Sequence, residues 1–288
     1  MKLALGTAQF GMDYGINNKR GKIPKKEAFE ILEEALSNGI RPIDTAFEYG
    51  DSERVIGSFV RKKGKKLEAV SKLPKCSPKE AASFLEKSLE RLNSKRLYGY
   101  LVHDFDSFAN EPELWDEMKS FKEQGKARKI GFSLYYPGQA EMLLENGVDF
   151  GIVQLPYSVL DQRFSEVLPR LKEKGVEVHA RSVFLQGLVF KRPEGLEGNF
   201  EGARESIAAI RRISAETGVP VSAICINFAS LNKGISKAVV GVDSRQNFLE
   251  NIAAFSYQNK VKKVMPELLK LGINDENIVV PGNWKVME

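Results

Sequence analysis

The sequence has little cysteine and little histidine. Among its 288 residues are two cysteines, Cys76 and Cys225, which lie far apart and outside any CxxC pair. The two histidines, His103 and His179, belong to no HxH or HExxH pattern. A disulfide framework needs several cysteines in a small secreted chain, and a zinc site needs clustered Cys and His ligands. We therefore expect neither disulfides nor a bound metal.

Long apolar runs are also missing. No run approaches the ~20 residues that a membrane-spanning helix needs. The apolar part of the N-terminal MKLALGTAQFG is too short for a signal peptide. With 42% hydrophobic and 28% charged residues, the composition is that of a globular chain that can bury a full core. We expect a cytoplasmic protein with no membrane partner.

Positive charge is in modest excess, with a formal net charge of +5. Its densest run, RKKGKK at residues 61–66, follows an amphipathic segment, and cations at a helix C-terminus interact favourably with the helix dipole. Nucleic-acid binding would require interleaved aromatic residues or a recognised module, and the run has neither. We interpret it as a solvated helix end and expect no nucleic-acid partner. The excess charge would help to attract an anionic ligand.

Short apolar segments alternate with longer amphipathic segments along the whole chain. Amphipathic helices are expected between the strands, as at 25–39 and at 77–93, where Ser77, Pro78 and Glu80 form an N-terminal capping pattern. Eight strand–helix units predict an α/β fold, a (β/α)₈ TIM barrel in a single domain over 1–288. The expected strands are 2–7, 41–45, 67–73, 97–103, 127–133, 151–155, 175–182 and 237–242.

Three further features concern the organisation of the domain. A doubly wound sheet is the alternative fold, but it usually carries GxGxxG after its first strand, whereas GTAQFG lacks the second glycine. The long segment at 183–200 predicts an ordered flap, since long loops in compact domains are usually functional or disordered and this one contains Leu and Phe. From about residue 263 to 288 we expect a C-terminal extension that packs on the barrel.

Polar side chains stand where three successive strands end. Asp44 ends the second strand, with Tyr49 just beyond it, Lys72 ends the third and His103 ends the fourth. Active sites of these barrels lie at the C-terminal ends of the strands. Each residue alone could be structural, but all four are expected to converge on one mouth.

With these residues in place, the chain resembles the aldo-keto reductase family over nearly its full length. The resemblance implies that Asp44, Tyr49, Lys72 and His103 are the catalytic tetrad of an enzyme that reduces a carbonyl group. It is carried by IDTAFEYGDSERVIG (43–57), VSKL with Lys72, LVHD (101–104), GKARKIGFS (125–133), VQLPYS (153–158) and VVGVDSRQNFLENIAAF (239–255).

The chemistry of the four residues agrees with this role. Reduction requires a hydride for the carbon and a proton for the oxygen, and a phenol with a pKa near ~10 is too weak an acid unless a cation stabilises the phenolate. We expect Lys72 to lower the pKa of Tyr49, Asp44 to hold Lys72, and Tyr49 to donate the proton. His103 is expected to hydrogen-bond the substrate oxygen.

The chain has no hydride donor of its own, so a nicotinamide cofactor is implied, NADPH with NADH possible. The chain departs from the family at Arg181, where many members have a tyrosine that stacks on the nicotinamide, and at Leu134, which replaces an asparagine. It also has Asp243 and Asn247 where a basic residue is common, which leaves Arg245 to pair with a 2′-phosphate. The resemblance places the cofactor on Ser133 and Gln154 (carboxamide), Arg181 (stacked on the nicotinamide ring or reaching a phosphate), Gln186 and Gly187 (pyrophosphate), and Gly241, Ser244, Arg245, Glu250 and Asn251 (adenosine).

Two other functions remain open at this stage. Lys72 could form a Schiff base in an aldolase, although this needs a depressed amine pKa that a neighbouring Asp44 opposes. The chain could also be a non-catalytic scaffold that binds the cofactor and reports redox state to a partner. The substrate is expected to be a small aldehyde, ketone or sugar-like carbonyl, and the chain a monomer or weak dimer.

Two segments bear on the substrate. The polar residues after the first strand, Asp13, Tyr14, Asn17 and Asn18, favour a hydroxylated substrate. Trp284 near the C-terminus either packs the tail onto the barrel or forms a wall of the substrate pocket.

Overall fold

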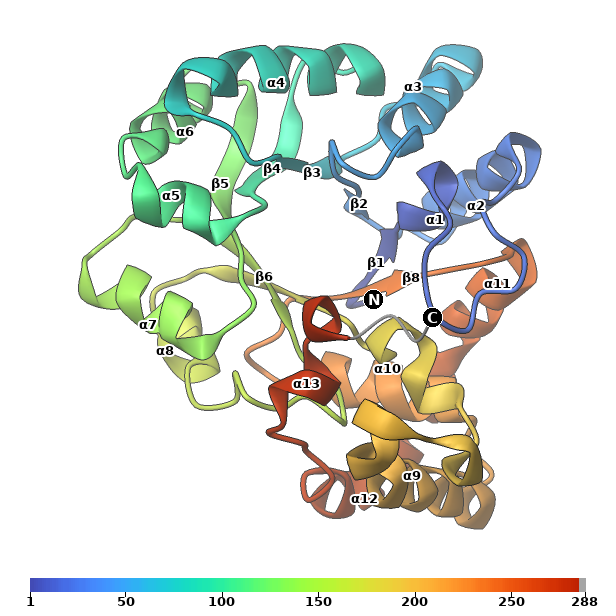
Figure 1. The fold of residues 1–288 in the computed structure, drawn as a ribbon. Helices are drawn as coiled ribbons and strands as arrows, with labels where there is room; N and C mark the ends of the chain where they lie inside the picture. Colours follow the sequence, from blue (N-terminus) through green and yellow to red (C-terminus); the bar gives the residue numbers. More distant parts are fainter. Residues whose placement is uncertain (285–288) are drawn as a thin grey trace.

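Eight parallel strands form a closed barrel in the computed structural model, which describes residues 1–284 (Figure 1). Strand order follows the sequence, and the barrel closes where Leu3 pairs with Ala238 in the last strand. Every strand lies within its predicted segment or one residue beyond it, so the predicted fold is confirmed. The strands are β1 (Leu3–Gly6), β2 (Ile43–Asp44), β3 (Ala69–Leu73), β4 (Leu97–Val102), β5 (Ala127–Ser133), β6 (Ile152–Pro156), β7 (Glu177–Arg181) and β8 (Lys237–Gly241).

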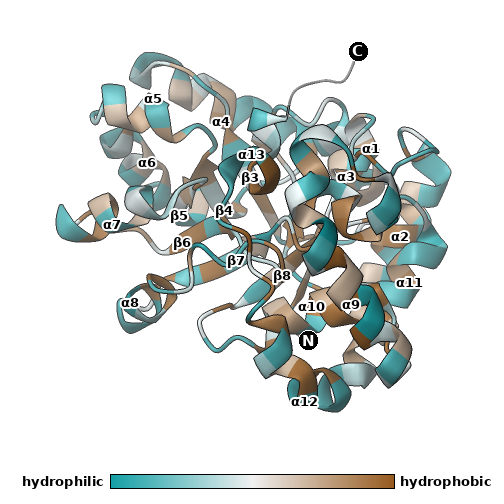
Figure 2. Ribbon diagram, turned by 60° about the horizontal axis from the view of Figure 1, so that its bottom comes forward, coloured by the Kyte–Doolittle hydropathy of each residue, from teal (hydrophilic) through white to brown (hydrophobic). Residues whose placement is uncertain are grey.

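Helices surround the barrel, and Figure 2 shows hydrophilic and hydrophobic residues alternating along those at its periphery, as expected of helices with one buried face. The helices are α1 (Ala8–Gly11), α2 (Lys25–Ser37), α3 (Ser52–Lys63), α4 (Pro78–Leu92), α5 (Phe105–Asn110), α6 (Leu114–Glu123), α7 (Pro137–Glu145), α8 (Leu168–Glu173), α9 (Arg204–Thr217), α10 (Val221–Leu231), α11 (Arg245–Ala253), α12 (Gln258–Leu268) and α13 (Glu276–Val279). The predicted cap of α4 is confirmed, because the Ser77 N–H donates to the Glu80 carboxylate at 3.0 Å.

The core has an outer layer and a small inner one. Most buried apolar side chains form one continuous cluster between strands and helices. Inside the barrel, Val70, Leu101 and Ile152 form a separate buried cluster. This inner cluster fills the barrel, as in other barrels of this class, and confines any cavity to the ends.

The long segment after β7 is ordered, as predicted. It forms three 3₁₀ turns, η1 (Leu185–Phe190), η2 (Pro193–Gly195) and η3 (Gly198–Ala203). Leu185, Leu188 and Val189 in η1 are buried. The flap is therefore packed onto the domain by its own apolar residues.

The C-terminal segment lies beside α9 and α10, with α12 and α13 coloured red in Figure 1. Arg163 binds Glu276 at 3.2 Å, which ties α13 to the segment after β6. The Trp284 indole N–H donates to the Ile278 carbonyl at 2.9 Å, and its ring meets Phe200 edge-on at 5.0 Å. Trp284 thus packs the segment against η3. Residues 285–288, which the predicted extension includes, lie outside the described residues.

Candidate active site

A cavity of about 500 Å³ opens at the carboxyl ends of the strands. Barrels of this class place their active sites at this face. Most of the predicted site residues meet there: the cavity is lined by Asp44, Tyr49, His103, Ser133, Gln154, Arg181, Gln186, Gly187, Gly241, Glu250 and Asn251. Lys72 is fully buried and bonded to Asp44. The four predicted catalytic residues are therefore brought together.

Two predicted cofactor residues do not line the cavity. Ser244 is the N-cap of α11, and its hydroxyl accepts a hydrogen bond from the Asn247 N–H at 3.1 Å. The Arg245 guanidinium forms an ion pair with Glu34 on α2. Sequence spacing placed these residues in the right segment but could not give the direction of their side chains.

Lys72 and Asp44 form a buried ion pair behind the cavity. Neighbouring strands β2 and β3 place them side by side, with the Lys72 ammonium 2.9 Å from Asp44 Oδ1 and 2.8 Å from the Thr45 carbonyl. The other carboxylate oxygen of Asp44 accepts from the Gln154 amide at 2.7 Å. Buried charges are tolerated only when they are paired and hydrogen-bonded, as these are.

Tyr49 lies in a tight turn that two glycines make possible. A Cβ on Gly11 would lie 1.7 Å from the Tyr49 carbonyl oxygen, and Gly50 adopts a positive φ of 53° with its own close approach to Gly11. Any side chain at Gly11 would push the Tyr49 backbone away. The turn therefore fixes the phenol at the cavity.

Tyr49 is held in its protonated form. The Lys72 ammonium lies 4.9 Å from the centre of the Tyr49 ring. Burial, and then the negative charge of Asp44, raise the pKa of Tyr49 above its usual value, while Arg181 acts in the opposite direction. The net direction is thus opposite to the expected lowering, and burial is its main cause. At neutral pH the residue carries its proton and can donate it.

His103 contacts both Tyr49 and an acidic residue. Its ring is 6.0 Å from the Tyr49 ring, in an edge-to-face arrangement. Its Nδ1 lies 2.7 Å from Glu48 Oε2, although the ring N–H is poorly aligned with that carboxylate. Burial lowers the pKa of His103, and the hydrogen bond to Glu48 partly opposes this. Sequence analysis did not single out Glu48, which lies inside the DTAFEYG motif.

Arg181 stacks on a protein ring. Its guanidinium carbon is 4.1 Å from the centre of the Tyr135 ring, and one terminal nitrogen donates to the Leu134 carbonyl at 2.9 Å. A second donates to the Ser182 hydroxyl at 3.2 Å. The planar guanidinium thus has one face on Tyr135 and holds a fixed positive charge at the cavity.

Two loops meet at the rim of the cavity. The Ile16 N–H, in the loop after β1, donates to the Gln186 carbonyl in η1 at 3.1 Å. Gly187 packs against Asn17 so closely that a Cβ would lie 2.7 Å from the Asn17 Cβ. This contact brings Tyr14, from the same β1 loop, into the lining. The connection between the two loops has no signal in the sequence.

The lining has polar atoms that lack protein partners, as expected of a site for a polar ligand. Gln9 Oε1, Arg181 Nε and Asn251 Oδ1 are buried without a hydrogen-bond partner among the described residues. Unpaired buried polar atoms are rare and costly, so they point to a missing ligand. A nicotinamide dinucleotide, with an amide, riboses and an adenine, fits this donor and acceptor set. Gln9 was missed from the sequence, where only its position after β1 could have indicated it.

The end of the cavity near α11 is acidic in composition. Asp243 and Glu250 both line it. Two arginines lie close by, but Arg20 binds Glu27 at 2.9 Å and Arg245 binds Glu34. As the sequence indicated, few basic side chains lie near Asp243, and the two arginines that do are paired with glutamates.

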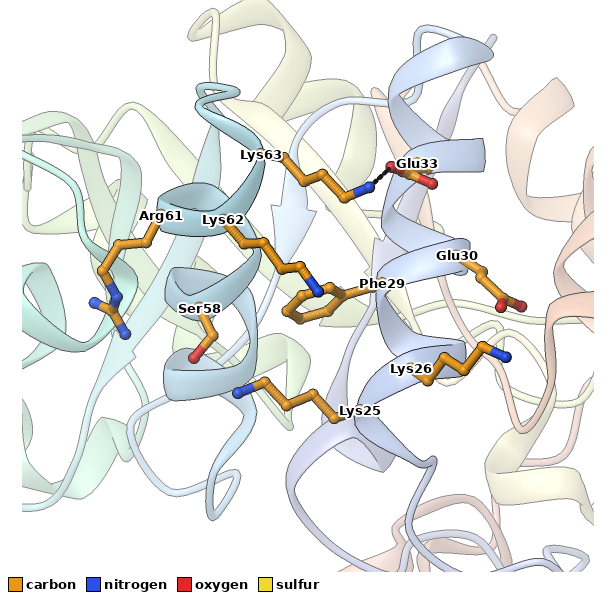
Figure 3. A pocket seen from close by; sticks show the side chains of 9 residues that line it. All are labelled: Lys25, Lys26, Phe29, Glu30, Glu33, Ser58, Arg61, Lys62 and Lys63. Atoms are coloured by element: carbon orange, nitrogen blue, oxygen red, sulfur yellow. Dashed lines mark ion pairs between the residues drawn. The ribbon is translucent and has the colours of Figure 1, made fainter.

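A second hollow lies on the outside of the barrel between α2 and α3 (Figure 3). Phe29 lies at its centre, with the ammonium groups of Lys25 and Lys62 5.8 and 5.9 Å from the ring centre. Lys63 forms an ion pair with Glu33 at 2.6 Å across the hollow. Surface cations that are paired or spread over an aromatic ring explain these residues without a ligand.

Residues 1–284 lack two other kinds of feature. No helix in this part of the chain is long and apolar enough to cross a membrane. No group of three or more His, Cys, Asp or Glu side chains within it could hold a metal ion.

Known proteins share both the fold and the sequence pattern. Among solved structures, an aldo-keto reductase from Bacillus halodurans in its holo form superposes with a TM-score of 0.72 at 19% identity, covering 96% of this chain and 94% of that one. The uncharacterized oxidoreductase YrpG of Bacillus subtilis is 30% identical over 217 residues, 65% of this chain and 64% of that protein. That match spans just under two thirds of the relative's length.

Two relatives are matched over most of their length. L-Galactose dehydrogenase of Arabidopsis thaliana is 26% identical over 279 residues, 90% of this chain and 84% of that protein. D-threo-aldose 1-dehydrogenase of a Pseudomonas species is 25% identical over 285 residues, 83% of this chain and 87% of that protein. Residues 2–272 match the sequence profile of the Aldo/keto reductase family, and the chain therefore belongs to that family of oxidoreductases.

Proposed function

We propose that this protein reduces an aldehyde or ketone to an alcohol with a nicotinamide cofactor, and that Tyr49 donates the proton. The observation that carries the proposal is a phenol at the cavity whose ring centre lies 4.9 Å from the Lys72 ammonium, with Asp44 bonded to that ammonium and His103 beside the ring. A group placed in this way can act as a general acid on a substrate oxygen.

Each residue around Tyr49 has its own role in the proposed reaction. As the proton leaves Tyr49, the Lys72 ammonium, 4.9 Å from the ring centre, stabilises the negative charge that develops there. Asp44 keeps that ammonium charged and in place. The substrate oxygen would receive the Tyr49 proton between the phenol and His103, whose rings lie 6.0 Å apart.

The cofactor would bind along the cavity lining. When bound in its reduced form, it would supply the hydride that the carbonyl carbon needs. Gln154 retains its amide oxygen for a carboxamide, since its amide nitrogen is committed to Asp44. Asn251 offers an unpaired carbonyl oxygen to an adenine amine, and Gln9 offers one close to Gly241.

We propose NADPH as the cofactor, with NADH as the alternative. Arg245 supports NADPH only if a 2′-phosphate draws it away from Glu34, since Asp243 and Glu250 line this end of the cavity. These carboxylates would repel a 2′-phosphate, so we expect the preference for NADPH over NADH to be small.

Sugar-like hydroxyaldehydes are the proposed substrates. Tyr14, Asn17 and Asn18 line the cavity from the β1 loop. Tyr14 and Asn17 bring a hydroxyl and an amide to the lining, whereas the Asn18 amide is bonded within the loop, to the Gly21 backbone. The names of two relatives, an L-galactose dehydrogenase and an aldose dehydrogenase, support this class.

The aldolase alternative is disfavoured by the surroundings of Lys72. Its ammonium donates to Asp44 and to the Thr45 carbonyl, and both contacts stabilise the charged form that cannot form a Schiff base. The non-catalytic scaffold would require a site that binds the cofactor but leaves Tyr49 idle. Activity measurements distinguish these functions.

The test is the oxidation of NADPH and NADH, followed at 340 nm, with a panel of hydroxyaldehydes, simple aldehydes and ketones. We expect turnover with at least one aldehyde and the reverse reaction with its alcohol. Cofactor binding without turnover across the panel would favour the scaffold. Capture of a ketone on Lys72 by borohydride would favour the aldolase.

A further inference from the structure

Glu48 is the one charged residue of the DTAFEYG motif to which the proposed chemistry gives no role. Its side chain is 52% exposed and does not line the cavity. One oxygen nevertheless lies 2.7 Å from His103 Nδ1, whose side chain is only 16% exposed. Glu48 can therefore act on the substrate only through His103.

Nδ1 of His103 has no better acceptor. It is buried and forms no well-aligned hydrogen bond with any described residue, so Glu48 Oε2, 2.7 Å away, is the acceptor available to it. A carboxylate can only accept, so this contact requires a proton on Nδ1. In a neutral imidazole the hydrogen bond made by one nitrogen decides which nitrogen carries the proton. The neutral ring then has a bare Nε2, which cannot donate to a carbonyl oxygen.

We propose that Glu48 is a positioning residue that holds the His103 proton on Nδ1, so that only the imidazolium can donate a hydrogen bond from Nε2 to the substrate oxygen. The inference rests on the proposed carbonyl reduction. It makes that reduction sensitive to the protonation of His103, with the competent form present at low pH and lost as pH rises.

The charged groups around His103 act in both directions. Lys72 from β3 and Arg181 from β7 disfavour the imidazolium, as does burial, whereas Glu48 favours it. Tyr49 lies against the ring but keeps its proton, because its pKa is raised above the usual phenol value. Asp104, next in the chain, is occupied in capping α5 through the Asp106 N–H. A pH step at the acidic side of the ordinary imidazole pKa is therefore assigned to His103, because burial lowers its pKa.

Glu48→Gln is the informative variant. The glutamine amide can donate to Nδ1, which permits the neutral tautomer with its proton on Nε2. We expect wild-type kcat/KM for reduction to fall by about tenfold per pH unit above the His103 titration, and the variant to change by less than about threefold over the same range. Glu145→Gln, which removes an exposed carboxylate at the end of α7, is the matched control and should keep the wild-type profile.

A second measurement does not depend on activity. The chain has two histidines, so ¹⁵N NMR of the imidazoles is readily assigned by comparison with His103→Asn. We expect neutral His103 to be protonated at Nδ1 in the wild type and to shift towards Nε2 in Glu48→Gln. A wild-type ring protonated at Nε2, or identical pH profiles for both proteins, would overturn the inference. Absence of any carbonyl reduction would instead defeat the proposed function, and the NMR result would still decide the tautomer.

Discussion

The two histidines sit in similar pairs with different surroundings. At the amino end of the barrel, fully buried His179 binds Glu177 at 2.8 Å, and Tyr98 and Lys129 also donate to that carboxylate. At the carboxyl end, His103 contacts Glu48, which has no comparable set of donors and is half exposed. A histidine and a glutamate thus form part of a buried structural cluster at the amino end of the barrel, and a single half-exposed contact at the carboxyl end.

The carboxylates of the two pairs differ in the same way. Burial alone would raise the pKa of Glu177, but hydrogen bonds from His179, Lys129 and Tyr98 outweigh it and lower the pKa to about 2. Glu48 has its pKa lowered chiefly by the one contact with His103. The Glu177 carboxylate is held by several hydrogen bonds in a buried network, which stabilises the fold. The Glu48 carboxylate has a single, exposed contact and can change it when a ligand binds.

The largest effect is expected at the carboxyl end, from Tyr49→Phe. Removing the proton donor should lower kcat for carbonyl reduction by roughly 10²- to 10⁴-fold, the range for lost general acid catalysis. The cofactor dissociation constant should hardly change, because the phenol acts on the substrate. Steady-state kinetics give kcat, and a cofactor fluorescence titration gives the cofactor dissociation constant. Near wild-type turnover, with chemistry rate-limiting, would exclude Tyr49 as the acid.

At the amino end, Glu177→Gln should lower stability and leave kcat/KM unchanged. Losing a buried carboxylate with three donors should cost about 2 kcal/mol at pH 7, by the usual value of hydrogen bonds to charged groups. The folded-state pKa of Glu177 lies near 2, below its ordinary 4.5, so its contribution is present above pH 4.5 and disappears as pH falls towards 2.

Urea unfolding at pH 7, 4.5 and 2.5 measures this difference. The gap in unfolding free energy between wild type and Glu177→Gln should narrow as pH falls. Glu48→Gln is the counterpart, with an altered pH–rate profile and little change in stability. If the Glu177 variant shifted the pH–rate profile instead, the two ends of the barrel would not be functionally separate.

Sequence reasoning named most of the residues that meet at the candidate site, because strand ends in a barrel must converge. The positions of Asp44, Lys72 and His103 follow from the ends of the predicted strands, and the assignment of these three with Tyr49 as a tetrad from the family resemblance. β2 is only two residues long, yet its neighbours fix its register, so Asp44 still meets Lys72.

The parts that could not be predicted depend on side chains from distant elements. Arg245 turns to Glu34, which comes from α2, 211 positions away in the chain. Gln9 lies at the cavity because Gly241 of β8 leaves space beside it. The pKa of Tyr49 depends on a balance between burial and the charges of Asp44, Arg181 and Glu48. None of these leaves a local pattern in the sequence.

At the rim of the barrel, Trp284→Ala should lower stability without changing catalysis. Loss of the Phe200 contact and of the bond to the Ile278 carbonyl should cost about 1–2 kcal/mol for a half-buried aromatic side chain. Trp284→Phe keeps the ring contact but not the indole N–H, so its stability should lie between those of the wild type and Trp284→Ala. Thermal unfolding measures the loss. A raised KM for substrate with an unchanged cofactor dissociation constant would instead place Trp284 at the substrate pocket.

The smallest effect is expected from Arg245→Ala, at the acidic end of the cavity. The exposed pair with Glu34 contributes little to stability, since surface ion pairs are weak. If a 2′-phosphate draws the guanidinium away from Glu34, the variant should lower the preference for NADPH over NADH by about tenfold, as the loss of one charge-assisted hydrogen bond. Glu34→Gln is the matched control, because it frees Arg245 and should raise the same preference. The dissociation constants of both cofactors, measured for all three proteins, decide the matter. Equal or absent losses in Arg245→Ala would restrict this residue to the contact between α2 and α11, and would leave the acidic lining to favour NADH.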